Sequence, residues 1–145
     1  LATRDAGPDL TFQLLIYPVV DSDLNRPSYK TYANAPMLPG HRMVYFWNQY
    51  VPDVEERGNW QCAPLRASSH SGLPPALVIA AGIDPLVDEG KSYAHQLNSS
   101  GVPVEYRLFS RMTHAFFQAP GLLSDAREAS NAAGAALQKA FGTGN

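Results

Sequence analysis

The chain contains two short apolar runs, Phe12–Tyr17 and Leu77–Ala81, that are almost free of polar residues. Each run has the length of a β-strand, and neither shows the polar alternation of a strand with one side facing solvent. Continuous apolar runs of this length are typical of strands buried on both faces, as in a parallel sheet. The two runs therefore predict a core built around buried parallel strands.

Helical patterns lie between and after these runs, and a third strand is expected at Val104–Phe109. Apolar residues recur at helical spacing over 41–50, and further helices are expected over 86–100 and 122–141. Strands that alternate with helices predict an α/β fold with a parallel sheet. Right-handed crossovers then place helices on both faces of that sheet.

The remaining stretches carry loop and turn signals. Residues 21–34 and 53–73 are polar or rich in Asn, Ser, Gly and Pro, and Ser110–Gly121 is also expected to be a loop. Residues 1–8 are typical of the last turn of a helix, ended by a Gly-Pro pair. No repeat or low-complexity tract interrupts this order.

Composition excludes several classes of protein. The chain has 145 residues and a net charge of −2, with an isoelectric point near 6.1, so it lacks the basic surface of a nucleic-acid binder. No apolar run approaches the ~20 residues that a membrane span needs. The single cysteine, Cys62, favours a reducing compartment and hence a cytoplasmic location. We interpret Cys62 as inert, half-buried packing rather than as a thiol nucleophile.

Two polar residues follow neighbouring predicted strands. Asp84 comes three positions after Ala81, and His114 comes five positions after Phe109. In open parallel sheets, ligands bind at the carboxyl ends of the strands. An aspartate that orients a histidine there is half of a Ser-His-Asp catalytic triad. Position alone leaves two alternatives open, because Asp84 can cap the helix beginning at Leu86 and His114 can be an ordinary loop residue.

A resemblance bears on that choice. The run Asp84-Pro85-Leu86-Val87-Asp88-Glu89-Gly90, with the strand before it, looks like the acid-bearing segment of bacterial hormone-sensitive-lipase-like carboxylesterases. Further similar runs follow the order of that family: Leu15–Val19, Tyr93-Ala94-x-x-Leu97, Gly101–Val104 and Met112-x-His114-x-Phe116. The resemblance implies an α/β-hydrolase sheet in which Asp84 is the triad acid and His114 the base. It also implies a small-molecule ester substrate and neither cofactor nor metal.

Two positions depart from the family pattern. Arg111 and Ala115 stand where the family usually has glycine. Glycine allows backbone conformations that a side chain resists, so the loop around His114 is expected to differ in shape. An Asp84 carboxylate oxygen is still expected about 2.6–3.2 Å from Nδ1 of His114, which leaves Nε2 free for a serine.

Other polar residues are interpreted as structural. The resemblance places Asp88 and Glu89 on the first turn of a helix, where the helix dipole favours negative charge. The other histidines show no metal-ligand pairing with Cys, Asp or Glu and are predicted to lie at the surface: His41, His70 and His95.

Four residues of the predicted helix over 41–50 are interpreted as its core-facing side: Met43, Tyr45, Phe46 and Trp47. In the carboxylesterase family that this chain resembles, the corresponding helix borders the acyl pocket. One or two of the four are therefore expected to serve both core and pocket.

The sequence lacks the Gly-x-Ser-x-Gly elbow that carries the nucleophile of an α/β-hydrolase, and it lacks a His-Gly-Gly-type oxyanion loop. In the family, both lie N-terminal to the acid and the base. Residues 1–145 are therefore expected to be a partial domain, the C-terminal portion of an α/β-hydrolase parallel sheet with flanking helices. The chain alone is expected to be inactive, and the complete protein is expected to be a serine esterase, with a homodimer as one expected state.

Two other classes of protein remain as alternatives. A non-catalytic α/β-hydrolase relative, acting as a binding or interaction protein, is the main alternative to an esterase, and an elbow sequence would discriminate between them. A dinucleotide-binding enzyme is disfavoured because no Gly-x-Gly-x-x-Gly follows any predicted strand.

Overall fold

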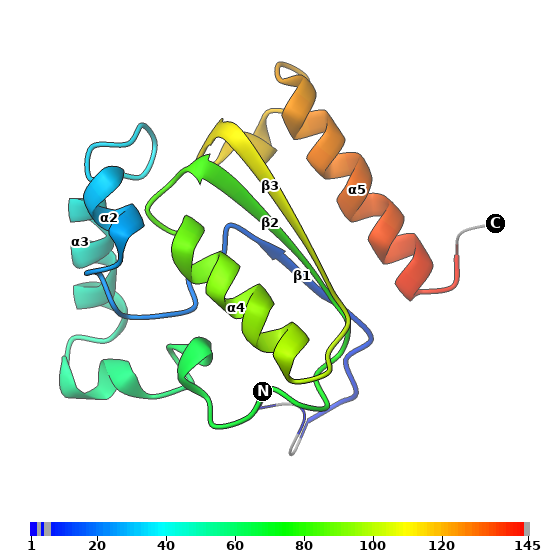
Figure 1. Ribbon diagram of the computed structural model, residues 1–145, viewed down its shortest axis with the longest axis horizontal. Helices are drawn as coiled ribbons and strands as arrows, with labels where there is room; N and C mark the ends of the chain where they lie inside the picture. Colours follow the sequence, from blue (N-terminus) through cyan, green and yellow to red (C-terminus); the bar gives the residue numbers. More distant parts are fainter. Residues whose placement is uncertain (3, 5–6, 144–145) are drawn as a thin grey trace.

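A parallel three-stranded sheet forms the centre of the computed structural model, which describes residues 1–2, 4 and 7–143 (Figure 1). The strands are β1 (Gln13–Ile16), β2 (Ala76–Ile83) and β3 (Val104–Thr113), in the order β1-β2-β3. Both neighbouring pairs are parallel, as predicted. Of the helix end expected over residues 1–8, positions 3, 5 and 6 lie outside the described residues.

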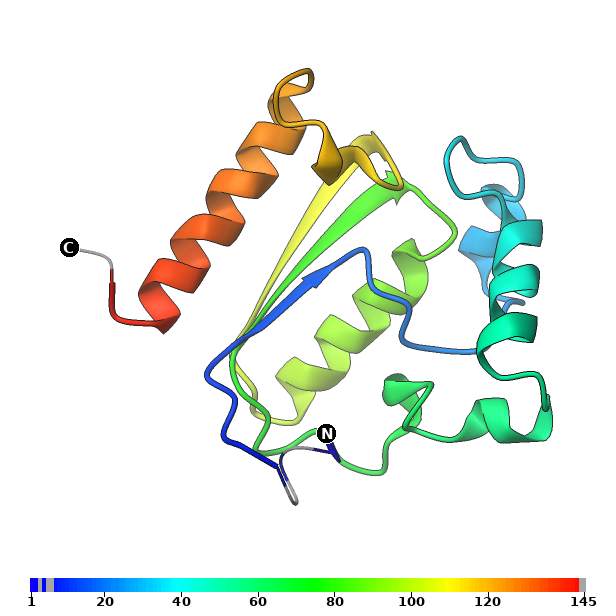
Figure 2. The same cartoon turned by 180° about the vertical axis from the view of Figure 1, so that it is seen from behind.

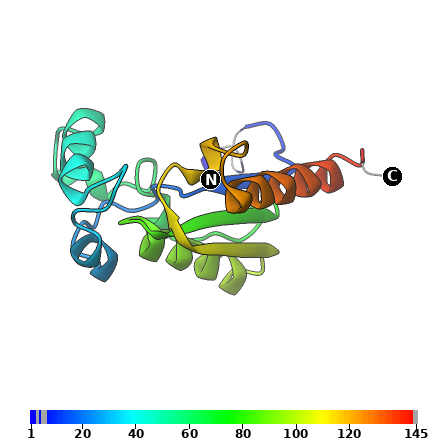
Figure 3. The same ribbon diagram turned by 90° about the horizontal axis from the view of Figure 1, so that it is seen from above.

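The helices are α2 (Pro27–Thr31), α3 (Gly40–Tyr50), α4 (Val87–Ser99) and α5 (Ser124–Ala140). Short 3₁₀ turns, η1 (Glu55–Gly58), η2 (Pro64–Arg66) and η3 (Phe116–Gln118), interrupt the connections. Helices α2 and α3 lie together at one side of the sheet, while α5 lies at the other (Figure 2). Seen from above, α4 and α5 cover opposite faces of the sheet, as expected for a parallel sheet with helices on both faces (Figure 3).

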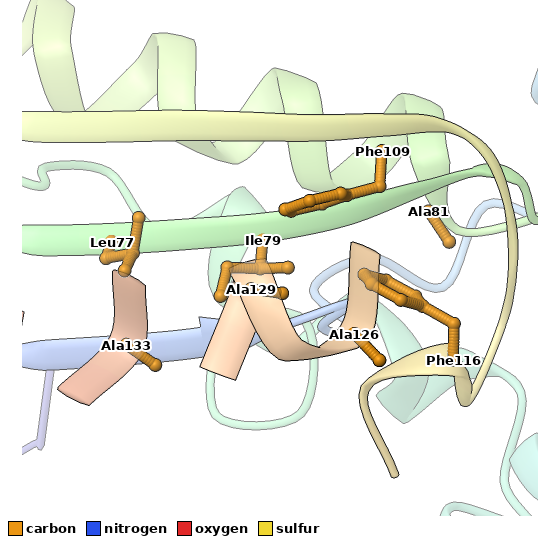
Figure 4. Packing of buried hydrophobic residues seen from close by; sticks show 8 residues of the cluster. All are labelled: Leu77, Ile79, Ala81, Phe109, Phe116, Ala126, Ala129 and Ala133. Carbon is orange, nitrogen blue, oxygen red and sulfur yellow. The ribbon is translucent and has the colours of Figure 1, made fainter. Parts of the chain in front are cut away.

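Strand β2 divides the core into two layers because successive side chains point to opposite faces. Leu77, Ile79 and Ala81 face α5 and pack against its buried alanines, Ala126, Ala129 and Ala133 (Figure 4). The small alanine side chains let the helix lie close to the sheet. On the other face, Ala76 packs in a cluster that contains Tyr93 and Leu97 of α4.

The two apolar runs differ in burial. Seven of the eight residues of β2 are buried, as predicted for a strand covered on both faces. The four residues of β1 are half-buried, and their side chains pack into the clusters on both faces of the sheet: Leu14 and Ile16 on one face, Leu15 on the other. Within the described residues, β1 pairs with β2 alone.

Within the described residues, no helix combines the length and the apolar character that crossing a bilayer requires.

Candidate active site

A glycine sets how closely β2 and β3 approach near their carboxyl ends. A Cβ atom on Gly82 would lie 2.3 Å from the carbonyl oxygen of Ser110 and 2.5 Å from its Cα atom. Non-bonded carbon atoms normally stay about 3.5–4.0 Å apart. Only a residue without a side chain therefore fits at position 82 while the backbone of β3 crosses there.

The same place carries a shift in strand register. Ala81 pairs with Phe109, whereas Ile83 pairs with Thr113, so β3 uses four residues where β2 uses two. The prediction that the third strand ends at Phe109 and continues as loop is therefore wrong, because β3 runs on to Thr113. Such bulges re-aim side chains at the ends of strands, and nothing in the local pattern of β3 marks this one.

The shift brings the two predicted site residues together. Asp84 directly follows Ile83, and His114 directly follows Thr113, so the residues leave paired positions of neighbouring strands. An Oδ2 atom of Asp84 lies 2.7 Å from Nδ1 of His114. A carboxylate only accepts hydrogen bonds, so Nδ1 is the donor, and in the neutral imidazole the lone pair is then on Nε2.

The carboxylate of Asp84 is almost fully buried, with 1% of its side chain exposed, whereas 22% of the His114 side chain is exposed. Its second oxygen, Oδ1, accepts a hydrogen bond from the backbone N–H of Leu86 at 2.9 Å. One oxygen of Asp84 thus accepts from the turn that precedes α4, and the other accepts from the imidazole of His114. This double attachment fixes the carboxylate in one orientation.

The ring of Tyr17 packs against the imidazole of His114. Its ring centroid lies 4.3 Å from that of His114, and its backbone N–H donates to the carbonyl oxygen of Ile79 at 2.6 Å. The φ angle of Tyr17 is 36°, a left-handed conformation that turns the chain sharply after β1. Burial, followed by the negative charge of Asp84, raises the pKa of the Tyr17 hydroxyl. Tyr17 is not among the site residues predicted from the sequence, although a tyrosine that ends an apolar strand before a proline was a visible signal.

Ala115 adopts the conformation that glycine favours. Its φ angle is 67°, which is uncommon for a residue with a side chain. The loop thus accommodates the departure at position 115 without swinging His114 away from Asp84. Arg111 lies in the extended end of β3 and is exposed.

An apolar pocket of about 510 Å³ opens beside His114. Helix α3 supplies one wall through Met43, Phe46, Trp47 and Tyr50. The rest of the lining comes from the β1–α2 and α2–α3 connections, the region of η1 and η2, and the residue before α4: Val19, Leu38, Gln61, Cys62, Pro64 and Leu86. A base next to such a pocket can act on a molecule whose apolar part is held there.

The interpretation of α3 as core-facing is correct for two of its four residues. Met43 and Trp47 are buried, and both also line the pocket. Tyr45 is 59% exposed and Phe46 is 46% exposed, and Phe46 borders the pocket rather than the core. The helical pattern of apolar residues is broader than the buried stripe because one side of α3 faces the pocket.

The acidic residues of α4 lie on its first turn, as expected. An Oδ2 atom of Asp88 accepts from the backbone N–H of Ser28 at 2.8 Å. Glu89 is fully buried, and its carboxylate accepts from the backbone N–H of Val20 at 2.9 Å and from the hydroxyl of Tyr29 at 3.1 Å. Burial raises the pKa of Glu89 to about 7.

The prediction of three surface histidines is wrong for His70. His41 and His95 are exposed, but His70 has 0% exposure, and its Nε2 atom lies 2.9 Å from the carbonyl oxygen of Pro64. Its ring packs edge-on against Tyr93 of α4, a contact that sequence spacing does not reveal.

Cys62 is half-buried, as expected, and its Sγ atom lies 3.2 Å from the backbone oxygen of Asn59. In the part of the chain that the structure describes, no group of three or more His, Cys, Asp or Glu side chains is arranged to hold a metal.

The chain is similar to several known proteins. The family model described as alpha/beta hydrolase fold matches residues 1–118. The chain is 34% identical over 123 residues to ethyl acetate hydrolase of Pseudomonas putida, covering 85% of the chain and 38% of that protein. It is 36% identical over 144 residues to carboxylesterase NlhH of Mycobacterium tuberculosis, covering 97% of the chain and 45% of that protein.

The chain is also similar to solved structures of a carboxylesterase and of an alpha/beta hydrolase enzyme. A thermophilic and thermostable carboxylesterase from a metagenomic library superposes with a TM-score of 0.89 at 35% identity, covering 96% of this chain and 48% of that chain. An alpha/beta hydrolase enzyme from the metagenome of Lake Arreo gives a TM-score of 0.90 at 38% identity. The chain thus spans less than half the length of the relatives described.

Proposed function

We propose, starting from the fact that this chain belongs to the alpha/beta hydrolase fold family, that it is the C-terminal portion of a carboxylic ester hydrolase. The predicted fold class is confirmed by the family match and by the solved structures. Within that family, the run Asp84–Gly90 favours the bacterial hormone-sensitive-lipase-like carboxylesterases. Residues 1–145 then form a partial domain that supplies the acid and the base of a Ser-His-Asp triad.

One observation carries the proposal. Asp84 and His114 leave paired positions at the carboxyl ends of neighbouring parallel strands and share a 2.7 Å hydrogen bond through Nδ1. That arrangement holds the tautomer in which Nε2 can accept a proton. The apolar pocket beside His114 supplies a place for the non-reacting part of a substrate.

The mechanism follows from these positions. A serine hydroxyl, contributed by an elbow outside this chain, attacks the ester carbonyl while Nε2 of His114 takes its proton. Asp84 stabilises the imidazolium that forms. His114 then gives the proton to the leaving alkoxide as the ester C–O bond breaks, which leaves an acyl-enzyme. Water, deprotonated by the same Nε2 atom, releases the carboxylic acid and restores the serine.

The substrate is an ester with an apolar group small enough for a cavity of about 510 Å³. Two named relatives, an ethyl acetate hydrolase and a carboxylesterase, support ester hydrolysis as the reaction class. A homodimer and a cytoplasmic location stay predictions, which gel filtration and cell fractionation of the complete protein test.

The decisive experiment replaces the acid in the complete protein. In Asp84→Asn, the amide donates to Nδ1 and forces the proton onto Nε2, so kcat on 4-nitrophenyl butyrate should fall by about 10⁴-fold. Asp125→Asn, on the first turn of α5, is the matched control and should keep wild-type kcat. The 145-residue chain alone should not turn over. A folded Asp84→Asn enzyme with near-normal kcat would refute the assignment, and a wild type without turnover would favour the non-catalytic alternative.

A further inference from the structure

Glu89 is a buried carboxylate outside the Asp84–His114 pair, and both its oxygens are used. It lies on the first turn of α4 with 0% exposure. Oε1 accepts from the backbone N–H of Val20, and Oε2 accepts from the hydroxyl of Tyr29. These partners lie far away in the sequence, on the connection between β1 and α3.

The two partners do not line the pocket beside His114, but each adjoins residues that do. Val20 directly follows Val19, which borders the pocket. The ring of Tyr29 packs in a buried cluster whose other members all line the pocket: Leu38, Met43, Trp47 and Leu86. A displacement of either partner of Glu89 therefore changes the width of the pocket.

Neighbouring contacts tie the same connection to the same helical turn. The backbone N–H of Ser28 donates to Asp88, and the Ser28 hydroxyl donates to the carbonyl oxygen of Pro85 at 2.5 Å. Together with the two bonds of Glu89, four hydrogen bonds join residues 20–29 to the turn that begins directly after Asp84. The triad acid and the pocket walls thus share one rigid attachment.

Burying a carboxylate at position 89 costs free energy of desolvation. Burial disfavours its charged form, so an apolar residue of similar size would serve packing alone at least as well. What the carboxylate adds is direction, because each oxygen meets one donor at a defined angle and distance. The Glu89 carboxylate is therefore expected to fix the position of the pocket walls rather than to improve packing.

We propose that Glu89 is a positioning residue of the pocket: its carboxylate, through Val20 and Tyr29, holds the two pocket walls at a fixed distance from the helix that follows Asp84. This inference rests on the proposed function in that the pocket receives the apolar group of the ester. Glu89 touches no reacting atom, so its loss should weaken binding of substrate and transition state equally. Such a loss raises KM and leaves kcat unchanged.

The test compares variants of the complete protein on 4-nitrophenyl butyrate, with rates expressed per folded molecule. In Glu89→Ala, KM should rise by about tenfold while kcat stays within about threefold. Glu89→Gln should stay within about twofold of wild type in both, because its amide can accept from Val20 and donate to the Tyr29 oxygen. Glu128→Ala, an exposed position on α5, is the control and should match wild type.

A second variant covers the case in which Glu89→Ala does not fold. Tyr29→Phe keeps the ring in its cluster and removes only the donor to Oε2, so KM should rise by about threefold. Combined with Glu89→Ala, it should add nothing further, because both changes break the same contact. Tyr29→Phe with unchanged KM overturns the proposal.

Binding of the non-hydrolysable ether butyl 4-nitrophenyl ether, measured by calorimetry, separates this inference from the esterase proposal. Its Kd should rise in Glu89→Ala by the same factor as KM. A wild type that binds the ether but hydrolyses no ester ends the esterase proposal and leaves the role of Glu89 standing. A Glu89→Ala protein with unchanged ether Kd, or with a lower kcat at unchanged KM, overturns the positioning role, as does a wild type that does not bind the ether.

Discussion

Gly82→Ala tests the link between backbone packing and the catalytic pair. The new Cβ atom would lie 2.3–2.6 Å from three backbone atoms of Ser110. To restore a normal separation between the new Cβ atom and Ser110, β3 must move away from β2 by about 1 Å. His114 lies four residues further along the same chain, so its 2.7 Å bond to Asp84 should lengthen beyond about 3.5 Å.

Two quantities should change together. Overpacking against a backbone that cannot rotate away should lower the free energy of unfolding by about 1–3 kcal/mol. A misplacement of about 1 Å at the base should lower kcat by about 100-fold. Urea unfolding of the complete protein measures the first, and turnover of 4-nitrophenyl butyrate per folded molecule measures the second.

Gly134→Ala is the matched control. Gly134 lies in α5, and a Cβ atom there would meet nothing within 4 Å. The substitution should raise the free energy of unfolding by about 0.8–1 kcal/mol through helix propensity and leave kcat unchanged. If Gly82→Ala unfolds at the wild-type urea concentration and retains kcat, the close approach of β2 and β3 does not set the Asp84–His114 geometry.

Two further predictions concern stability. Ala115→Gly should raise the free energy of unfolding by about 0.5–1 kcal/mol, because the 67° φ angle strains alanine and not glycine; urea unfolding measures it, and a loss of stability would contradict the strain. Burial raises the pKa of Glu89 from 4.5 to about 7, and the charge of Asp21 adds to the rise. Between those values the folded state keeps a proton that the unfolded state has lost. The contribution of Glu89 is therefore fully present below about pH 4.5, and about 3 kcal/mol is lost as the pH rises through 7. Glu89→Gln cannot ionise, so its unfolding free energy relative to wild type should grow by about that amount from pH 4.5 to 8; a constant difference would contradict the assignment.

Much of the fold could be predicted from local patterns. The run Leu77–Ala81 and the helical spacing over 41–50 mark β2 and α3, because side-chain periodicity records which faces of a single element meet apolar surroundings. The candidate pair followed from topology, since parallel strands bring their carboxyl ends to one edge. Resemblance then selected the same two residues, Asp84 and His114, from among several carboxylates and histidines.

Other features depend on contacts between distant segments. Nothing around His70 or Glu89 in the sequence marks them as fully buried. His70 contacts Pro64 and Tyr93, and Glu89 contacts Val20 and Tyr29. These contacts form only when the chain folds.

The sequence by itself determined the order of the three strands and of helices α3, α4 and α5, the two residues that leave adjacent strands, and the absence of an elbow from residues 1–145. Only the tertiary structure decided that β3 continues to Thr113 and that its backbone passes close to Gly82. It also decided the shift in register between β2 and β3, which brings Asp84 to His114. The physical reason is that periodicity depends on neighbours within a few residues. A register depends on which backbone atoms of two separate strands can approach, and that is set only when both are packed in one sheet.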